Sequence, residues 1–434
     1  MSPAIASSNP PTYTTSLSGE NLRRLHRLDA IKSLVNSTVR SHPLNAVQPR
    51  PIDSLRRGDW VKLICGASFE DAADIRNLSL VYSLAGVDCI DCAADESVVN
   101  AVNDGIDAAM NIGSVERPWV MISVNDDKED LHFRKAEFDP EDCPLDCSRP
   151  CEKVCPANAI LLENSSTGNH SLGSSDVLGR LQGGVVTERC YGCGRCFPVC
   201  PFDKISAKTY IRDPAATSEL LKRNDVDAIE IHTTGRHIDL FNELWESLGD
   251  SIKHVKLVAV SMPDVGKSTF TTMSAMYKIM ESRLIGYNLW QLDGRPMSGD
   301  IGRGATREAI DFAMRLAALP DRPHGFYQLA GGTNLHTIDS LKKVGLFKAI
   351  KFSEQGFENT SAVGITDSVQ ALIGGVAYGG YARKIIGRVL CKLPTQPYCM
   401  LIEDYPEHLM EALTEALTLV GPVKSYKLPL ACTK

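Results

Sequence analysis

The stretch WVKLICGASFEDAADIRNLSLVYSLAGVDCIDCAA, residues 60 to 94, predicts a strand, a helix and a second strand in succession. Residues 60–68 are an apolar, β-rich run typical of a buried strand. Residues 69–86 place apolar side chains on approximately one helical face and end at Gly86, a stop signal for a helix. Residues 87–94 form a second apolar run, as expected for a parallel sheet covered on both faces. The apolar residues of the helical face are Ile75, Leu78, Leu80, Tyr82 and Leu84.

The same alternation of strand and helix continues along the chain, with an interruption between about residues 135 and 205. A third strand is predicted at residues 118–124, and five more strands follow the interruption, each with a helix after it. Eight β/α units favour a closed (β/α)8-type barrel over an open doubly wound sheet. The later strands are predicted at residues 227–234, 255–261, 286–294, 325–332 and 361–367, and the last helix at residues 368–390.

Composition limits the classes of function. The chain has 434 residues, a formal net charge of -7 and 14 cysteines, eight of which lie within residues 143–200. A chain of this length buries an ample core without cross-links, so clustered cysteines indicate a metal rather than disulfides. No run of Lys and Arg with interleaved aromatic residues is present, which disfavours a nucleic-acid partner. No stretch approaches 18 uninterrupted apolar residues, which excludes a spanning helix.

The first part of the chain has a different composition. Residues 1–50 contain twelve Ser and Thr, six Lys and Arg, and two acids, Glu20 and Asp29. This composition is typical of organellar transit peptides, and a plain disordered tail is the alternative. We therefore predict that residues 1–51 form a disordered N-terminal extension, with a plastid transit segment as one interpretation.

Three further segments follow this extension. Residues 52–134 hold the first β/α units of the barrel, residues 135–205 form a cysteine-rich insertion, and residues 206–434 hold the remaining units. The insertion follows the third predicted strand, where the βα loops of a barrel accept insertions and also build active sites.

The second cysteine run, CYGCGRCFPVCP at residues 190–201, has the bacterial ferredoxin spacing. In that pattern three cysteines bind one cluster and the fourth binds the other cluster. We therefore expect Cys190, Cys193 and Cys196 to share one cluster and Cys200 to bind a second one.

The first run, CPLDCSRPCEKVCP at residues 143–156, departs from this pattern because its first two intervals are each one residue longer. If the same crossing holds, Cys143, Cys147 and Cys151 bind the cluster of Cys200, and Cys155 completes the other cluster. Two 4Fe-4S clusters are the expected cofactors. The wider loops leave one alternative, in which Cys143 or Cys147 is not a ligand and this cluster is 3Fe-4S.

Two zinc sites are a further alternative, because zinc also binds paired cysteines. Zinc sites do not require the ferredoxin order of cysteines, and no histidine lies at ligand spacing, since His170 sits in a polar spacer. The pattern therefore favours iron-sulfur clusters and one-electron chemistry.

Two glycine-rich segments suggest a phosphate site in the barrel. AGGTN (330–334) and GGVAYGGYARKI (374–385) lie in the seventh and eighth β/α units, where barrels bind phosphate groups through backbone N–H groups. A flavin such as FMN, or another phosphate-bearing ligand, is one interpretation, and tight turns with close helix packing are the other. The candidate residues are Gly331, Gly332, Gly379, Gly380, Arg383 and Lys384.

Other polar residues near the ends of predicted strands are weaker candidates. They could be catalytic groups of a barrel enzyme, but structural hydrogen bonding and loop anchoring explain them better. No catalytic residue is assigned on this basis. These residues are Lys62, His232, Arg236, His237, Asp293 and Arg295.

The opening stretch, the two cysteine runs, AGGTN and GGYARKIIG (379–387) together resemble the light-dependent-period (LdpA) proteins of cyanobacteria and plastids. The resemblance covers about residue 52 to the C-terminus. It implies an iron-sulfur redox sensor that conveys the light-dependent redox state of the cell to the circadian clock. It carries over the eight cysteines and no catalytic residue.

Two functions from different classes are consistent with these observations. The first is a redox sensor or one-electron carrier whose partners are redox proteins or the quinone and ferredoxin pool. The second is a flavin-dependent barrel oxidoreductase supplied with electrons by the two clusters. The N-terminal composition favours the chloroplast stroma as its location, and a cyanobacterial cytoplasm is the alternative.

Overall fold

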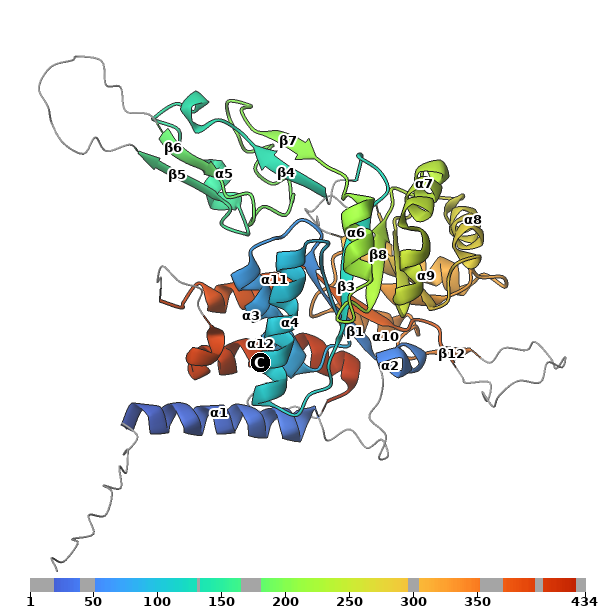
Figure 1. Ribbon diagram of the computed structural model, residues 1–434, viewed down its shortest axis with the longest axis horizontal. Coiled ribbons are helices and arrows are strands. Elements are labelled where there is room, and N and C mark those ends of the chain that lie inside the picture. Colours follow the sequence, from blue (N-terminus) through green and yellow to red (C-terminus); the bar gives the residue numbers. More distant parts are fainter. Residues whose placement is uncertain are drawn as a thin grey trace, which may run out of the picture.

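The centre of the protein is a closed barrel of eight parallel strands with helices around it (Figure 1). The computed structural model describes residues 19–39, 51–130, 133–164, 181–295, 304–351, 370–394 and 401–426. The strand order is β1-β14-β11-β10-β9-β8-β3-β2, and β2 pairs with β1 to close the barrel. The (β/α)8-type barrel is therefore confirmed. Its strands are β1 (Trp60–Gly66), β2 (Cys89–Ala93), β3 (Trp119–Asn125), β8 (Ala228–His232), β9 (Leu257–Met262), β10 (Tyr287–Leu292), β11 (Phe326–Leu329) and β14 (Gly375–Tyr378).

The helices outside the barrel bury the faces that their apolar residues predict. In the first β/α unit, the Asp71 side chain caps helix α3 by accepting from Asp74 N at 3.1 Å, and the helix ends before Gly86 as expected. Among the described residues, no helix is long and apolar enough to cross a membrane. The helices are α2 (Pro51–Arg57), α3 (Ala72–Ala85), α4 (Glu96–Ile112), α6 (Pro214–Leu221), α7 (Ile238–Leu248), α8 (Thr269–Glu281), α9 (Ala305–Ala317), α10 (Thr337–Lys343), α11 (Gly380–Leu390) and α12 (Pro406–Lys424).

The cysteine-rich insertion lies between β3 and α6, as the sequence predicts. Because it follows the end of β3, it projects from the mouth of the barrel formed by the carboxyl ends of the strands (Figure 1). Two antiparallel strand pairs, β4 with β7 and β5 with β6, form its framework. Its elements are β4 (Arg134–Glu137), the 3-10 helix η2 (Pro140–Asp142), α5 (Pro150–Val154), β5 (Ile160–Asn164), β6 (Leu181–Val185) and β7 (Ser206–Thr209).

The eighth strand of the barrel differs from the prediction. The strand expected at residues 361–367 lies outside the described residues, and β14 lies within the segment predicted as the last helix. This part of the prediction was wrong because the three apolar residues between the two glycine pairs continue a helical pattern as well as they form a short strand. Pairing with both neighbours decides the outcome, as in the register of Trp60 with Gly375 and of Gln328 with Gly375.

Part of the N-terminal extension is also ordered. Residues Gly19–Thr38, which composition places in a disordered segment, form helix α1 alongside α12 and α4. Ile31, Val35 and Thr38 follow helical spacing and are buried. The residues before Gly19 lie outside the described chain, so the transit-segment interpretation stays a prediction.

The lower half of the barrel interior is apolar. Trp60 and Trp119 meet edge to face with ring centroids 5.9 Å apart, and Ile52 and Leu55 of α2 join the same cluster from below. This apolar cluster fills the end of the barrel that lies away from the mouth. A binding or catalytic site in the barrel is therefore expected at the mouth, at the carboxyl ends of the strands. The other members of the cluster are Cys89, Met121, Ala228, Leu257, Ala259, Leu289 and Phe326.

A buried polar layer lies above this apolar cluster. The Lys62 ammonium donates to the Glu230 carboxylate and lies 3.9 Å from Asp91, and all three side chains are inaccessible to solvent. Gln291 donates to Glu230 at 2.8 Å, and Ser123 donates to Asp91 at 2.6 Å. The layer therefore pairs its single ammonium group with two carboxyl groups, and Asp91 Oδ2 is held by the charge of Lys62 alone, without a hydrogen bond.

The pKa values in this layer follow from burial and from the neighbouring charges. Burial by itself lowers the pKa of Lys62, but the Glu230 and Asp91 carboxylates raise it above its usual value. Burial raises the pKa of Asp91 to about 7, although Lys62 opposes that shift. Lys62 therefore stays charged, and its role here is to hold the interior of the barrel together.

We predict that Lys62→Met destabilises the protein by about 3–5 kcal/mol, because it leaves buried carboxylates without a counter-charge. The double variant Lys62→Met/Glu230→Gln should recover at least half of this loss. Urea unfolding monitored by circular dichroism measures both. An unchanged midpoint for Lys62→Met would contradict this role.

Candidate metal centre

The insertion has a small core of its own, separate from the barrel interior. Ala136, Ile160, Leu162 and Ile205 come from its strands and from the loop before β7, and they pack together with the cysteine side chains. Cysteines form part of this core rather than an exposed row, so the core positions their sulfur atoms. No described cysteine forms a disulfide.

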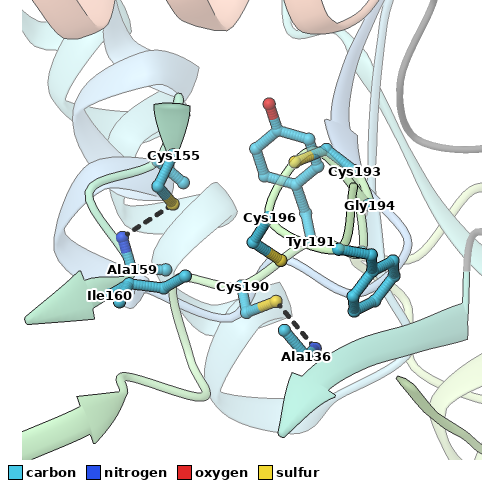
Figure 2. A pocket seen from close by; sticks show the side chains of 12 residues that line it. Ala136, Cys155, Ala159, Ile160, Cys190, Tyr191, Cys193, Gly194 and Cys196 are labelled. Atoms are coloured by element: carbon cyan, nitrogen blue, oxygen red, sulfur yellow. Dashed lines mark hydrogen bonds between the residues drawn. The ribbon is translucent and has the colours of Figure 1, made fainter. Parts of the chain in front are cut away.

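Four cysteines surround one cavity of the insertion (Figure 2). Cys190, Cys193 and Cys196 come from the second run, and Cys155 comes from the first run. The ring of Tyr191 lies beside them, and the remaining lining is mostly alanine, glycine and apolar side chains. We call these four residues the barrel-side group. They are the set that the ferredoxin crossing predicts for one cluster.

Backbone N–H groups donate to two of these sulfur atoms. Ala159 N–H donates to Cys155 Sγ at 3.2 Å, and Ala136 N–H donates to Cys190 Sγ at 3.3 Å, as the dashed lines of Figure 2 show. Such hydrogen bonds favour the thiolate form and tune the potential of a bound cluster.

Two glycines make the loop of the second run possible. Gly192 and Gly194 have φ values of +71° and +77°, a region that favours glycine. A Cβ atom at either position would lie 2.3 Å from an atom of Arg134, whose side chain extends from β4 into the loop. Arg134 Nε donates to the Gly192 carbonyl at 3.1 Å, and its guanidinium lies 5.1 Å from the Phe197 ring centroid. Together, the glycines and Arg134 define the shape of the loop.

The other four cysteines form a second group, which we call the outer group: Cys143, Cys147, Cys151 and Cys200. Burial raises the pKa of Cys143, and the nearby thiols of Cys147 and Cys200 raise it further. Burial is also the main cause of the raised pKa of Cys151, to which the same two thiols contribute. Lys204 N–H donates to Cys200 Sγ at 3.4 Å. Both cysteine runs therefore contribute to each group.

Several of these cysteines are buried enough that their thiols resist ionisation unless a positively charged group binds them. Burial raises the pKa of Cys196 to about 12, and the neighbouring thiols of Cys193 and Cys190 raise it further. A buried set of four thiols ionises when it binds metal ions, whose positive charge offsets the cost of burial. The donor set therefore fits an iron-sulfur cluster, which supplies one-electron chemistry when it is bound.

The spacing of the sulfur atoms bears on the choice between zinc and a cluster. Tetrahedral zinc with Zn–S bonds of about 2.3 Å needs sulfur atoms roughly 3.8 Å apart. Within the described residues, the set of potential ligand atoms that all lie within 4.8 Å of one another is Asp127, Glu129 and His237, and it contains no cysteine. Among the described residues, the thiols therefore do not show the close spacing of a single tetrahedral zinc site.

Comparison with known proteins shows which family the insertion and the barrel resemble. Residues 143–211 match the LdpA Fe-S cluster-binding domain, and residues 220–422 match the light dependent period A C-terminal domain. The light dependent period A protein of Synechococcus elongatus is 40% identical over 378 residues, which cover 86% of this chain and 94% of that protein.

The chain belongs to the light dependent period A family. Its insertion is accordingly an iron-sulfur cluster-binding domain. Among solved structures, pyruvate kinase of Cryptosporidium parvum in complex with ADP has a TM-score of 0.33 at 8% identity, and the match covers 90% of this chain and 72% of that one. A score this low carries no argument about function.

In this LdpA protein, the barrel-side group meets the barrel through Tyr191. The guanidinium of Arg383, on α11, lies 4.2 Å from the centroid of the Tyr191 ring. The same guanidinium donates to the Cys65 carbonyl at the end of β1. Phe69 packs edge to face with Tyr191, with ring centroids 6.4 Å apart. A cation–π contact of this kind contributes about 1 kcal/mol.

Ion pairs add to this junction. Glu70, in the loop after β1, accepts from Lys135 and from Arg212, both at 2.7 Å. Lys135 also donates to the Thr187 carbonyl at 2.8 Å, and Glu70 N–H donates to the Glu188 carbonyl at 2.8 Å. The sequence analysis assigned no role to Glu70 or Tyr191. The position of Tyr191 between Cys190 and Cys193 could have indicated that its side chain lies beside the cluster site.

The candidate phosphate residues of the barrel have different environments. Arg383 is engaged by Tyr191 and the Cys65 carbonyl, whereas Lys384 is exposed. Gly331 lies against the Asp293 carbonyl, and the Gly332 carbonyl accepts from Thr306 at 2.6 Å. Gly379 and Gly380 lie together at the start of α11. The two glycine segments follow neighbouring strands, since β11 pairs with β14 and Thr333 donates to the Ala377 carbonyl at 2.6 Å. A phosphate or flavin site stays a prediction.

The remaining candidates lie near the mouth or on the surface. His232 is buried, 3.4 Å from Glu230, and packs edge to face on Phe133. Arg236 and His237 are exposed, whereas Asp293 is buried and accepts from Ser261. Arg295 pairs with Glu308 at 3.0 Å.

We predict that Arg383→Gln lowers the reduction potential of the barrel-side cluster, because the guanidinium favours the more negative, reduced form. A loss of about 1 kcal/mol corresponds to roughly 40 mV for one electron. Lys384→Gln removes the same charge one residue away and should shift the potential less. Redox titration followed by EPR measures both, and equal shifts would contradict a specific role for Arg383.

Proposed function

We propose that this LdpA protein is a redox sensor with two 4Fe-4S clusters, which passes the oxidation state of its clusters to the barrel. The observation that carries the proposal is the pairing of cysteines: each group of four draws on both runs. Cys155 lines one cavity with Cys190, Cys193 and Cys196. Lys204, whose N–H donates to Cys200, has its ammonium 4.0 Å from Asp142 beside Cys143, which supports the reverse crossing.

The contact between module and barrel supports sensing over storage of electrons. Reduction adds negative charge beside Tyr191 and Arg383, and Arg383 also holds the Cys65 carbonyl of β1. A change in charge at the cluster therefore acts directly on a barrel residue. The name of the Synechococcus elongatus relative, light dependent period A, supports a link between this redox state and light. Location in the chloroplast stroma remains part of the proposal and rests on the composition of residues 1–50.

A flavin-dependent oxidoreductase is the second candidate. It is supported by Gly379 and Gly380, which stand at the start of α11 directly after β14, the position of phosphate sites in barrel enzymes. In that case the clusters would supply electrons to a flavin at the mouth of the barrel. The engagement of Arg383 by the module favours the sensor.

The test is to purify the protein without oxygen and to measure iron, acid-labile sulfide and flavin on one sample. The sensor predicts about eight irons per chain and no flavin, since each cubane holds four irons. Stoichiometric flavin would favour the oxidoreductase. About seven irons would identify a three-iron outer cluster, and zinc in place of iron would contradict both candidates.

Removal of one ligand tests the crossing. Cys155→Ser should change the EPR signal of the cluster held mainly by the second run and leave the other signal unchanged. Cys391→Ser is the matched control, because Cys391 is an exposed cysteine outside both groups. Loss of both signals in Cys155→Ser but not in the control would contradict independent clusters.

A further inference from the structure

Two large apolar side chains are exposed beside the outer group. Leu145, between Cys143 and Cys147, is 46% exposed, and Phe202, two residues after Cys200, is 43% exposed. Both sit on the loops that carry cluster cysteines rather than on the outer helices of the barrel. Exposed apolar residues at such a site are typical of interaction surfaces.

These two loops lie side by side. Lys204 Nζ, in the loop after Cys200, lies 4.0 Å from the Asp142 carboxylate, directly before Cys143. The two loops therefore present one continuous surface over the outer group. We call the exposed residues 141–146 and 201–204 the outer face.

The charge of the outer face is mostly negative. Glu141, Asp142, Asp146 and Asp203 are exposed, and Lys204 is the single basic residue of these two segments. Lys204 is already near Asp142, so it offsets part of this charge. A cluster bound by four thiolates adds negative charge of its own. A partner for this face therefore needs positive charge around an apolar centre.

Each group has one buried and three partly exposed cysteines, but the barrel covers one side of the barrel-side group. Tyr191, Phe69 and Arg383 cover it on the side of the barrel. Electron exchange with another protein falls off with distance, so the outer group is the better point of exchange.

We propose that the outer face is the docking surface for a basic one-electron carrier protein, which exchanges electrons with the outer cluster. The proposal rests on the two-cluster function above and names its partner class. An apolar centre with a charged rim suits a short-lived complex, in which charge sets the rate of encounter and apolar contact sets the orientation. One electron passes between the outer cluster and the partner's redox centre, and no proton moves.

The experiment uses cluster-loaded full-length protein, reduced with dithionite and freed of excess reductant. Cytochrome c, a lysine-rich haem protein, is the basic probe, and its reduction is followed by stopped-flow absorbance. Each event oxidises one cluster and converts a ferric haem to a ferrous one. The proposal predicts a rate constant that falls as salt is added. With an acidic plant-type ferredoxin as probe, the rate should rise with salt.

Two variants test the outer face directly. The triple variant Asp142→Asn/Asp146→Asn/Asp203→Asn should slow cytochrome c reduction about tenfold at low salt and flatten its salt dependence. The variant Phe202→Ser should slow it several-fold at all salt concentrations, because apolar contact does not depend on screening.

Matched controls alter equivalent residues on the barrel. Asp104→Asn/Asp107→Asn/Asp311→Asn removes three exposed acids, and Ile285→Ser removes a side chain that is 72% exposed. Both should leave the rate within about twofold of the parent protein.

Iron content and the EPR signals of each variant are measured first. If the parent protein binds no clusters, the proposed function and the docking surface both fail. If clusters are intact but the outer-face variants behave like the barrel controls, or if salt accelerates cytochrome c reduction, the docking surface is overturned and the sensor function stands.

Discussion

One side-chain amide, that of Asn125, holds both ends of the insertion at the mouth of the barrel. Its nitrogen donates to the carbonyls of Asp127 and Tyr210, both at 3.1 Å, and its oxygen accepts from Arg212 N–H at 3.2 Å. Asp127 lies where the chain enters the insertion, and the other two lie where it leaves. Asn125 is buried at the end of β3, so the rigid barrel sets the position of the module. The contacts of Tyr191 with the barrel depend on this placement.

The two cysteine groups have unequal surroundings as a result. The barrel-side group lies behind Tyr191, with Arg383 as a neighbouring cation, whereas the outer group lies under loops with exposed apolar and acidic residues. A cation near a cluster favours reduction, and surrounding acids oppose it. Electrons that arrive at the outer group would therefore pass toward the barrel. Below the mouth, the Lys62 layer and the apolar cluster around Trp60 and Trp119 fill the interior of the barrel.

Much of this arrangement could be predicted from sequence because local patterns determine it. Apolar runs alternating with helical faces predict the barrel. The ferredoxin spacing predicts which cysteine of each run binds the cluster held mainly by the other run. The eighth strand could not be predicted, since its four residues become a strand through pairing with β1 and β11. Helix α1 was missed because composition conceals the spacing of Ile31 and Val35. Arg383 was predicted as part of a phosphate site because of its position in the eighth β/α unit. In the structure its guanidinium packs on the ring of Tyr191, a contact between distant parts of the chain that the local sequence does not reveal.

The proposed sensor depends on clusters that are each built from both cysteine runs. Anomalous X-ray diffraction at the iron edge, from crystals grown without oxygen, shows this directly. Two iron peaks are expected, one bordered by Cys155, Cys190, Cys193 and Cys196, and the other by the outer group. One peak within each run, with Cys155 and Cys200 each bound to its own run, would contradict this arrangement, as would a signal at the zinc edge.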